Sequence, residues 1–126
     1  MYCPNCKTEL IVVERDKIEL DYCPNCKGFW FDNGEWELLC ARLALVSKSS
    51  LTDLNTIPPI NTNEMSKSCP YCSVKMDKIL AYGTILDRCP RGHGIWFDAG
   101  ECSRVFSSAS SSRVGTPIEF LGEVFY

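Results

Sequence analysis

The chain contains two copies of one cysteine pattern, and this duplication limits its fold more than any other feature. Shifting the sequence by 66 residues aligns the two copies without a gap. The copies share the turns CPNC and CPYC, the later turns CPNC and CPRGH, and the segments GFWFDNGE and GIWFDAGE. Each copy has roughly 40 residues or fewer through the start of its helix, too few for a stable core without a metal, a disulfide or a partner.

The cysteine spacing in the first copy is typical of a zinc site. The turn with Cys3 and Cys6 and the turn with Cys23 and Cys26 are separated by 16 residues, which form two β-rich runs around a polar turn. A hairpin of this kind returns the chain so that the four thiolates surround one point as a tetrahedron. The pattern predicts a closed structural zinc site, with a rubredoxin-like iron site as the alternative.

The second copy has three cysteines and a displaced candidate for the fourth ligand. Cys69, Cys72 and Cys89 align with the first three ligands, but Gly92 replaces the last cysteine and is followed by His93, the single histidine of the chain. We predict that His93 closes this site, so that the chain holds two zinc ions. The competing interpretation is an open site with three protein ligands and a water, which would have Lewis-acid chemistry.

The number of cysteines bears on the redox compartment in which the protein works. Nine cysteines fit either a secreted disulfide framework or an intracellular metal protein. We expect no leader before Cys3 and find no apolar run of the roughly 18 residues that a membrane span needs, so we predict a reducing cytoplasm. Cys40 and Cys102 fall on apolar helical stripes and are interpreted as buried residues, with a redox or ligand role as the alternative. Thiol redox catalysis at the CPxC turns is a further, weaker alternative.

The fold class follows as small, α+β and metal-stabilised, with two tandem zinc-ribbon or treble-clef-like modules. In each module a β-hairpin lies between the cysteine turns and an α-helix follows, with Asp32 and Glu35, then Asp98 and Glu101, as capping boxes. The predicted ranges are 1–47 for the first module with its helix, 48–68 for a linker, 69–106 for the second module with a short helix, and 107–126 for a Ser-rich tail with an apolar end.

Two apolar features could contact partners. The segment PIEFLGEVFY alternates in polarity and could add a strand to a sheet edge in this chain or in another, which would allow self-association. Its alternative is a strand docked on its own module or a frayed end. Trp30 and Trp96 could be exposed anchors, but packing beneath the zinc sites is the simpler interpretation.

At GFWFDNGE and GIWFDAGE, each following its cysteine turns, the chain resembles the transcription-factor-IIB-like zinc-ribbon family, in two tandem copies that cover well over half of the sequence. The resemblance implies a ribbon fold and zinc ligation by the family's ligand positions. These fall on Cys3, Cys6, Cys23, Cys26, Cys69, Cys72, Cys89 and His93. A role in transcription does not follow from the ribbon alone.

Charge separates the classes of function. The chain has a net charge of -3 and a pI near 5.1, and thiolate ligands add further negative charge, whereas nucleic-acid binders present a basic surface. No nucleophile, acid–base pair or phosphate loop indicates an enzyme. We therefore expect a non-catalytic zinc-binding protein that acts as an adaptor or regulator through protein contacts. The alternative is a transcription-related nucleic-acid binder using a patch in the second copy, formed by Lys75, Lys78, Arg88, Arg91 and Arg104.

Overall fold

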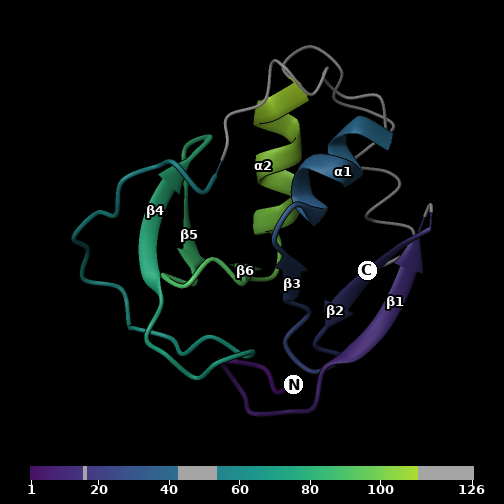
Figure 1. The fold of residues 1–126 in the computed structure, drawn as a ribbon, viewed down its shortest axis with the longest axis horizontal. Coiled ribbons are helices and arrows are strands. Elements are labelled where there is room, and N and C mark those ends of the chain that lie inside the picture. The colour runs from purple at the N-terminus through teal and green to yellow at the C-terminus, as the bar shows by residue number, and fades with distance from the viewer. Residues whose placement is uncertain (16, 43–53, 111–126) are drawn as a thin grey trace.

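The computed structural model describes residues 1–15, 17–42 and 54–110 (Figure 1). Each repeat contributes three strands and one short helix to the described part of the chain. The first repeat contains β1 (Ile11–Arg15), β2 (Ile18–Tyr22), β3 (Phe29–Asp32) and α1 (Glu35–Arg42). The second contains β4 (Asp77–Ala81), β5 (Thr84–Arg88), β6 (Gly94–Phe97) and α2 (Glu101–Ser110).

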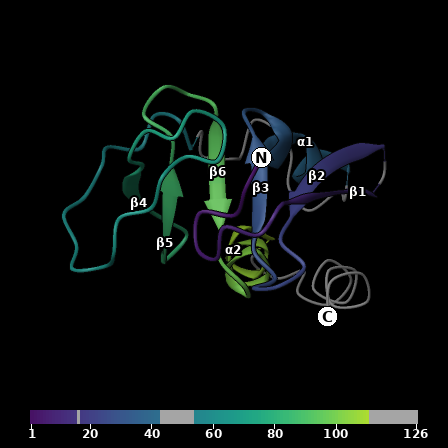
Figure 2. The ribbon, with the colours of Figure 1, turned by 90° about the horizontal axis from the view of Figure 1, so that it is seen from below.

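The strands of both repeats form one antiparallel sheet. Its order is β1-β2-β3-β6-β5-β4, so the outer strand of each repeat is at an edge and the third strands meet at the centre. Figure 2 shows β3 and β6 side by side between the two hairpins. The hairpin between β4 and β5 turns at Tyr82 and Gly83, which both have positive φ (50° and 76°), the backbone conformation of a tight two-residue turn.

The central pairing relates the two repeats by an approximate two-fold axis. Trp30 pairs with Trp96, its own counterpart 66 residues later, while Phe29 pairs with Phe97 and Phe31 pairs with Ile95. Phe29 therefore faces the counterpart of Phe31, and Phe31 faces the counterpart of Phe29. The repeats therefore pack within one chain as the subunits of a symmetric dimer do.

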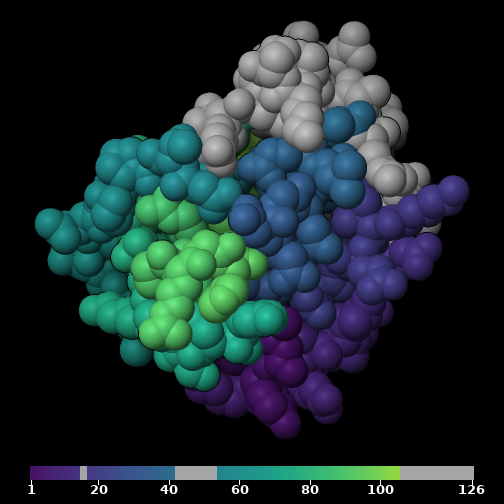
Figure 3. Space-filling model, viewed as in Figure 1, coloured from purple at the N-terminus to yellow at the C-terminus, as the bar shows by residue number. Residues whose placement is uncertain are grey.

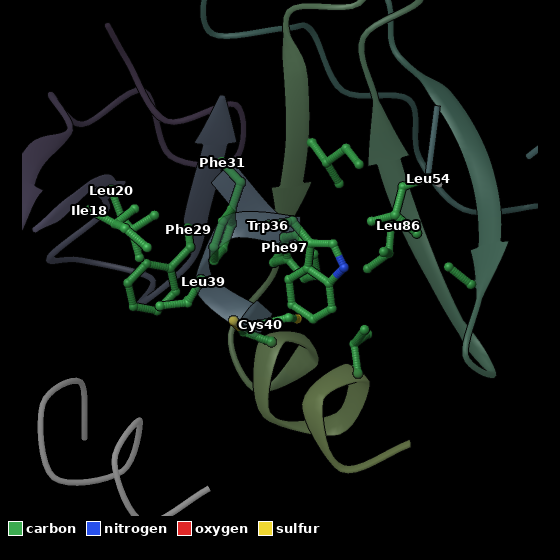
Figure 4. Packing of buried hydrophobic residues seen from close by; sticks show 14 of the residues in the cluster. Ile18, Leu20, Phe29, Phe31, Trp36, Leu39, Cys40, Leu54, Leu86 and Phe97 are labelled. Atoms are coloured by element: carbon green, nitrogen blue, oxygen red, sulfur yellow. The ribbon is translucent and has the colours of Figure 1, made fainter. Parts of the chain in front are cut away.

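The sheet has a buried cluster on each face. On one face, Phe29, Phe31 and Phe97 pack with Trp36 and Leu39 of α1, and the rings of Trp36 and Phe97 stack with centroids 5.2 Å apart (Figure 4). A second cluster contains the two central tryptophans and buried cysteines from all four turns. In Figure 1 the helices lie above the central strands, and the start of the chain lies below them.

The structure inserts an element that the sequence analysis did not predict. A third strand, β3 or β6, stands between the second cysteine turn and the helix, where we expected the helix to follow directly. The Trp-Phe-Asp segment forms this strand because its alternate side chains have two clusters to enter: Phe31 joins the helix face and Trp30 the opposite face. α2 also continues to Ser110, past the predicted end of its module.

Part of the predicted linker lies against the second repeat. Leu54 is fully buried, and the Nη1 atom of Arg88 donates hydrogen bonds to the carbonyls of Leu54 at 2.9 Å and of Ile57 at 2.5 Å. Ile60 forms a bridge to Lys78 of β4. The apolar tail falls among residues 111–126, outside the described part of the chain.

Candidate metal centres

The first cysteine group brings together the four side chains that the sequence indicated. The Sγ atoms of Cys3, Cys6, Cys23 and Cys26 all lie within 4.8 Å of one another. Cys3 Sγ lies 3.5 Å from Cys26 Sγ, and Cys6 Sγ lies 3.3 Å from Cys23 Sγ. Four sulfurs about 2.3 Å from a tetrahedral zinc ion lie about 3.8 Å apart, so a small relaxation of this group fits the metal.

The second group combines three sulfurs with an imidazole. Cys69, Cys72, Cys89 and His93 also offer ligand atoms within 4.8 Å of one another. The Nδ1 atom of His93 lies 3.5 Å from Cys89 Sγ, and the sulfurs of Cys72 and Cys89 are 3.7 Å apart. These separations suit a tetrahedral site with zinc–sulfur bonds of about 2.3 Å and a zinc–nitrogen bond of about 2.0 Å.

A change in one turn explains why a histidine can replace a cysteine one residue later. In three turns the amide four residues after the first cysteine donates to that cysteine's carbonyl, as Lys27 does to Cys23 at 2.9 Å. In the fourth turn Gly92 closes the bond one residue earlier, donating to Cys89 at 3.1 Å with a φ of 78°. Glycine adopts this conformation without a steric cost, and the tighter turn leaves His93 facing the sulfurs.

All four turns nevertheless keep the same overall length. Cys23 donates its amide to the carbonyl of Gly28 at 3.0 Å, and Cys89 donates to Gly94 at the same distance. The first turn of each repeat is closed in the same way. The change of ligand is therefore contained within the turn and does not shift the strand that follows.

The sequence analysis did not identify two equivalent residues that lie beside the ligands, one at each site. Asn5 and Tyr71 occupy the same position in the two repeats, and each approaches the fourth ligand of its own site. The Nδ2 atom of Asn5 lies 3.9 Å from Cys26 Sγ, while the ring of Tyr71 lies 4.3 Å from the ring of His93. An amide donor suits a thiolate and an aromatic ring suits an imidazole, so the two sites differ in their surroundings as well as in their ligands.

Backbone amides also point at the sulfurs. The amide nitrogens of Asn5 and Tyr71 lie 3.3 Å from the first sulfur of their turns, and that of Arg91 lies 3.4 Å from Cys89 Sγ. Hydrogen bonds to a charged group favour the charged form. The turns are therefore preorganised for thiolates.

The thiols of each site differ strongly in acidity. Burial raises the pKa of Cys3 well above its usual value and that of Cys69 to about 12. A hydrogen bond from the Asn25 side chain is the largest of several influences that lower the pKa of Cys6 to about 5. Complete ionisation of each group therefore requires a cation, which is the contribution that zinc makes when it binds.

Asp98 is close in sequence to the second site, and its carboxylate is fully engaged. It accepts hydrogen bonds from Trp96 Nε1 at 2.8 Å and from Asn5 Nδ2 at 2.7 Å, and it pairs with Lys67. Burial favours a higher pKa for Asp98, but these donors, Lys67 first, hold it below its usual range. The bond from Asn5 also ties the first repeat to the second, and Figure 3 shows the first residues of the chain lying against the start of the second repeat.

The capping boxes form only in part. The amide of Asp32 donates to Glu35 Oε1 at 2.8 Å, and Asp98 donates to Glu101 in the same way. The aspartate side chains, however, accept from the tryptophans, as Asp32 Oδ1 does from Trp30 Nε1 at 2.8 Å. The predicted cap is replaced by a link between the helix start and the buried indole.

The other predicted candidates are buried. Trp30 and Trp96 are 0 % exposed, so they belong to the core and are not surface anchors. Cys40 and Cys102 lie in the helix-side cluster, and burial raises the pKa of Cys40 to about 12 and that of Cys102 well above its usual value. Both behave as small apolar residues.

A small sheet carrying two groups of zinc ligands on paired turns defines a tandem zinc-ribbon protein. The family model described as a transcription factor zinc-finger, of the TFIIB zinc-ribbon type, matches residues 2–42 and 68–108. The chain belongs to this family, with two copies and a zinc-binding group in each. No curated protein and no solved structure matches the chain significantly. Within the described residues, no helix is long and apolar enough to cross a membrane.

Proposed function

We propose that this chain is a non-catalytic adaptor whose zinc ions are structural and whose surface binds other proteins. Each ligand group supplies four protein atoms, and a zinc ion with four protein ligands keeps no position for a substrate or a reactive water. Asp98, a carboxylate close to the second site in sequence, is already held by three donors. Both features support structural zinc.

The proposed modules are ribbons, each a hairpin held between cysteine turns and followed by a third strand and a short helix. Zinc supplies the folding free energy that such a small unit lacks, on the order of 10–16 kcal/mol for comparable peptide sites.

Thiolate ligands persist where cysteines are kept reduced. We therefore place the protein in a reducing cytoplasm.

The observation that favours protein partners over nucleic acids is the pairing of basic residues inside the second repeat. Lys78 is 7 % exposed and forms an ion pair with Asp87 at 2.6 Å, and Arg88 is 8 % exposed and donates to the carbonyls of residues 54 and 57. These two side chains are not available to phosphates. The candidate basic patch is reduced to three exposed residues: Lys75, Arg91 and Arg104.

Nucleic-acid binding remains the second candidate because Lys75 and Arg91 are exposed beside the second metal group. Binding through them would rest on phosphate contacts and would weaken steeply with salt. A titration of zinc-loaded protein with generic duplex DNA and with RNA at low salt tests this alternative. The adaptor proposal predicts no saturable shift, together with recovery of one specific protein by cross-linking and affinity capture. A salt-sensitive shift without such a partner would contradict it.

A further inference from the structure

The outer edge of β4 is covered by the segment that leads into the second repeat. The amide of Ile60 donates to the carbonyl of Lys78 at 2.8 Å, so this segment adds a short extension to the sheet (Figure 1). Farther along, Glu64 lies 3.5 Å from Lys78 Nζ. Lys67 then pairs with both Asp87 and Asp98 on the face opposite the helices.

The equivalent edge in the first repeat has no such cover in residues 1–15, 17–42 and 54–110. Val12 occupies the position of Lys78, and among the described strands β1 pairs only with β2. Ile11 and Val12 are 47 % and 61 % exposed. An edge strand with exposed apolar residues is a template for an added strand.

The face beside this edge is acidic. Val12 is the register partner of Asp21, Glu14 is the partner of Glu19, and Asp21 in turn pairs with Trp30 of β3. Register partners share a face, so these carboxylates lie on the side opposite the helices. In the second repeat the same positions hold Lys78, Leu80 and Ile85 around Asp87, so the acidic strip is specific to the first repeat.

The cations that neutralise Asp87 have no full counterpart at Asp21. Val12 replaces Lys78, and Met1 replaces Lys67, so neither side chain of the first repeat brings an ammonium group to Asp21. The carboxylate therefore gains from an added ammonium group.

We propose that the β1 edge and the carboxylates of Glu14, Glu19 and Asp21 bind an extended, lysine-bearing segment of a protein partner, in the way that residues 60–67 cover the second repeat. This inference rests on the adaptor function proposed above and names the chemistry of the partner. A backbone amide of the partner donates to the carbonyl of Val12, as Ile60 does to Lys78. A lysine four residues later, at the place of Glu64, brings to Asp21 the ammonium that Val12 lacks.

The chain itself supplies a probe for this site. The probe is a labelled peptide copy of residues 57–67 with Glu64 replaced by lysine (E64K), added to zinc-loaded full-length protein. We expect saturable binding that weakens with salt. The unmodified peptide, whose Glu64 faces the acidic strip, should bind about tenfold more weakly or worse. The lysine peptide does not suit the second repeat, because it would meet Lys78 there.

Two changes separate backbone pairing from charge. Methylation of the peptide amide at Ile60 removes the donor and should weaken binding up to about tenfold. On the protein, Glu19→Lys should weaken binding about threefold or more, whereas Glu37→Lys, the same charge change on α1, should not. Equal binding of the methylated peptide, or equal effects of the two protein variants, would overturn the proposal.

Two other occupants are tested in the same assay. If deletion of residues 111–126 markedly tightens peptide binding, the tail of the chain occupies this edge and the proposal is wrong. If the peptide instead dissociates a dimer, the occupant is a second copy and the proposal is equally wrong. A captured protein partner that binds Glu19→Lys as well as the unaltered chain would overturn this site while leaving the adaptor function intact.

Discussion

Trp30 and Trp96 face each other at the centre of the sheet, and each indole covers a glycine of the opposite repeat. A Cβ atom on Gly28 would lie 2.3 Å from Cζ2 of Trp96, and one on Gly94 would lie 2.7 Å from Cζ2 of Trp30. Within the motif of the first repeat, Gly28 contacts Trp96 and Trp30 contacts Gly94, so the two residues make separate contacts across the two-fold axis. This exchange makes the two ribbons one packed unit.

Gly28→Ala should destabilise the protein by about 1–3 kcal/mol, because the added methyl group must displace a buried ring. Chemical denaturation of the zinc-loaded protein measures the loss. Addition of Trp96→Phe should recover part of it by making room. Trp30→Phe is the matched control, since it removes the same group from the wrong side. Equal recovery by both changes would refute the exchange of contacts between repeats.

His93→Ala should abolish zinc retention at the second site and leave the first site loaded. The structural reason is that His93 Nδ1 is the only nitrogen in a ligand group whose other members are sulfurs. The double substitution Gly92→Cys with His93→Lys restores the sequence pattern of the first repeat and should restore retention. Cobalt substitution distinguishes the two cases, because a fourth thiolate strengthens the sulfur-to-metal absorption. Retention of both ions by His93→Ala would exclude the ligand.

The helix-start glutamates should give the stability a pH dependence. Burial raises the pKa of Glu35 and of Glu101 to about 7, above the ordinary value of 4.5. Their contribution is complete below pH 4.5 and is lost as the pH rises through about 7, since the folded state holds the extra protons. Glu35→Gln keeps an acceptor for the Asp32 amide and removes this titration. Its unfolding midpoint should therefore rise relative to wild type between pH 5 and pH 8.

Glu37→Gln, on the same helix, is the control for that comparison. Both variants retain the zinc sites, so the pH dependence of metal binding cancels when each is compared with wild type. A constant difference between Glu35→Gln and wild type across this interval would contradict the assignment.

Alkylation should sort the nine cysteines into two classes. With zinc bound, we expect slow reaction throughout. The earliest additions should fall on the seven cysteines of the ligand groups, while Cys40 and Cys102 should react only after chelation or denaturant has unfolded the chain, because both are buried with raised pKa values. Mass spectrometry of the alkylated chain counts the additions. Early labelling of Cys102 would contradict its place in the core.

The sequence was informative where ligand chemistry and local periodicity act. The spacing of four sulfurs predicted the first group, and the alignment at Gly92 predicted that His93 joins the second, because a metal-ligand group requires few atoms at fixed intervals. The third strands were missed, since a four-residue strand such as Phe29–Asp32 is too short to give a periodic signal, and much of its pairing is with its counterpart from the other repeat. The same holds for Asn5 and Lys67, whose contacts with Asp98 join distant positions.

The contacts of residues 54–60 also could not be predicted from local sequence. Their composition suggested a linker, with a Pro-Pro pair and no periodicity. Leu54 is buried where Arg88 binds its carbonyl and the carbonyl of Ile57, and no pattern within the segment predicts a contact with that distant arginine. The position of this segment therefore depends on hydrogen bonds from a residue distant in sequence, which its own composition cannot predict.

Native mass spectrometry of the untagged protein, with Met1 free because Cys3 lies so near it, tests the central claim of two closed structural zinc sites most directly. We expect two zinc ions per chain, held at stoichiometric zinc with every cysteine reduced. One zinc ion, or a second ion lost under conditions that retain the first, would contradict closure of the second site by His93.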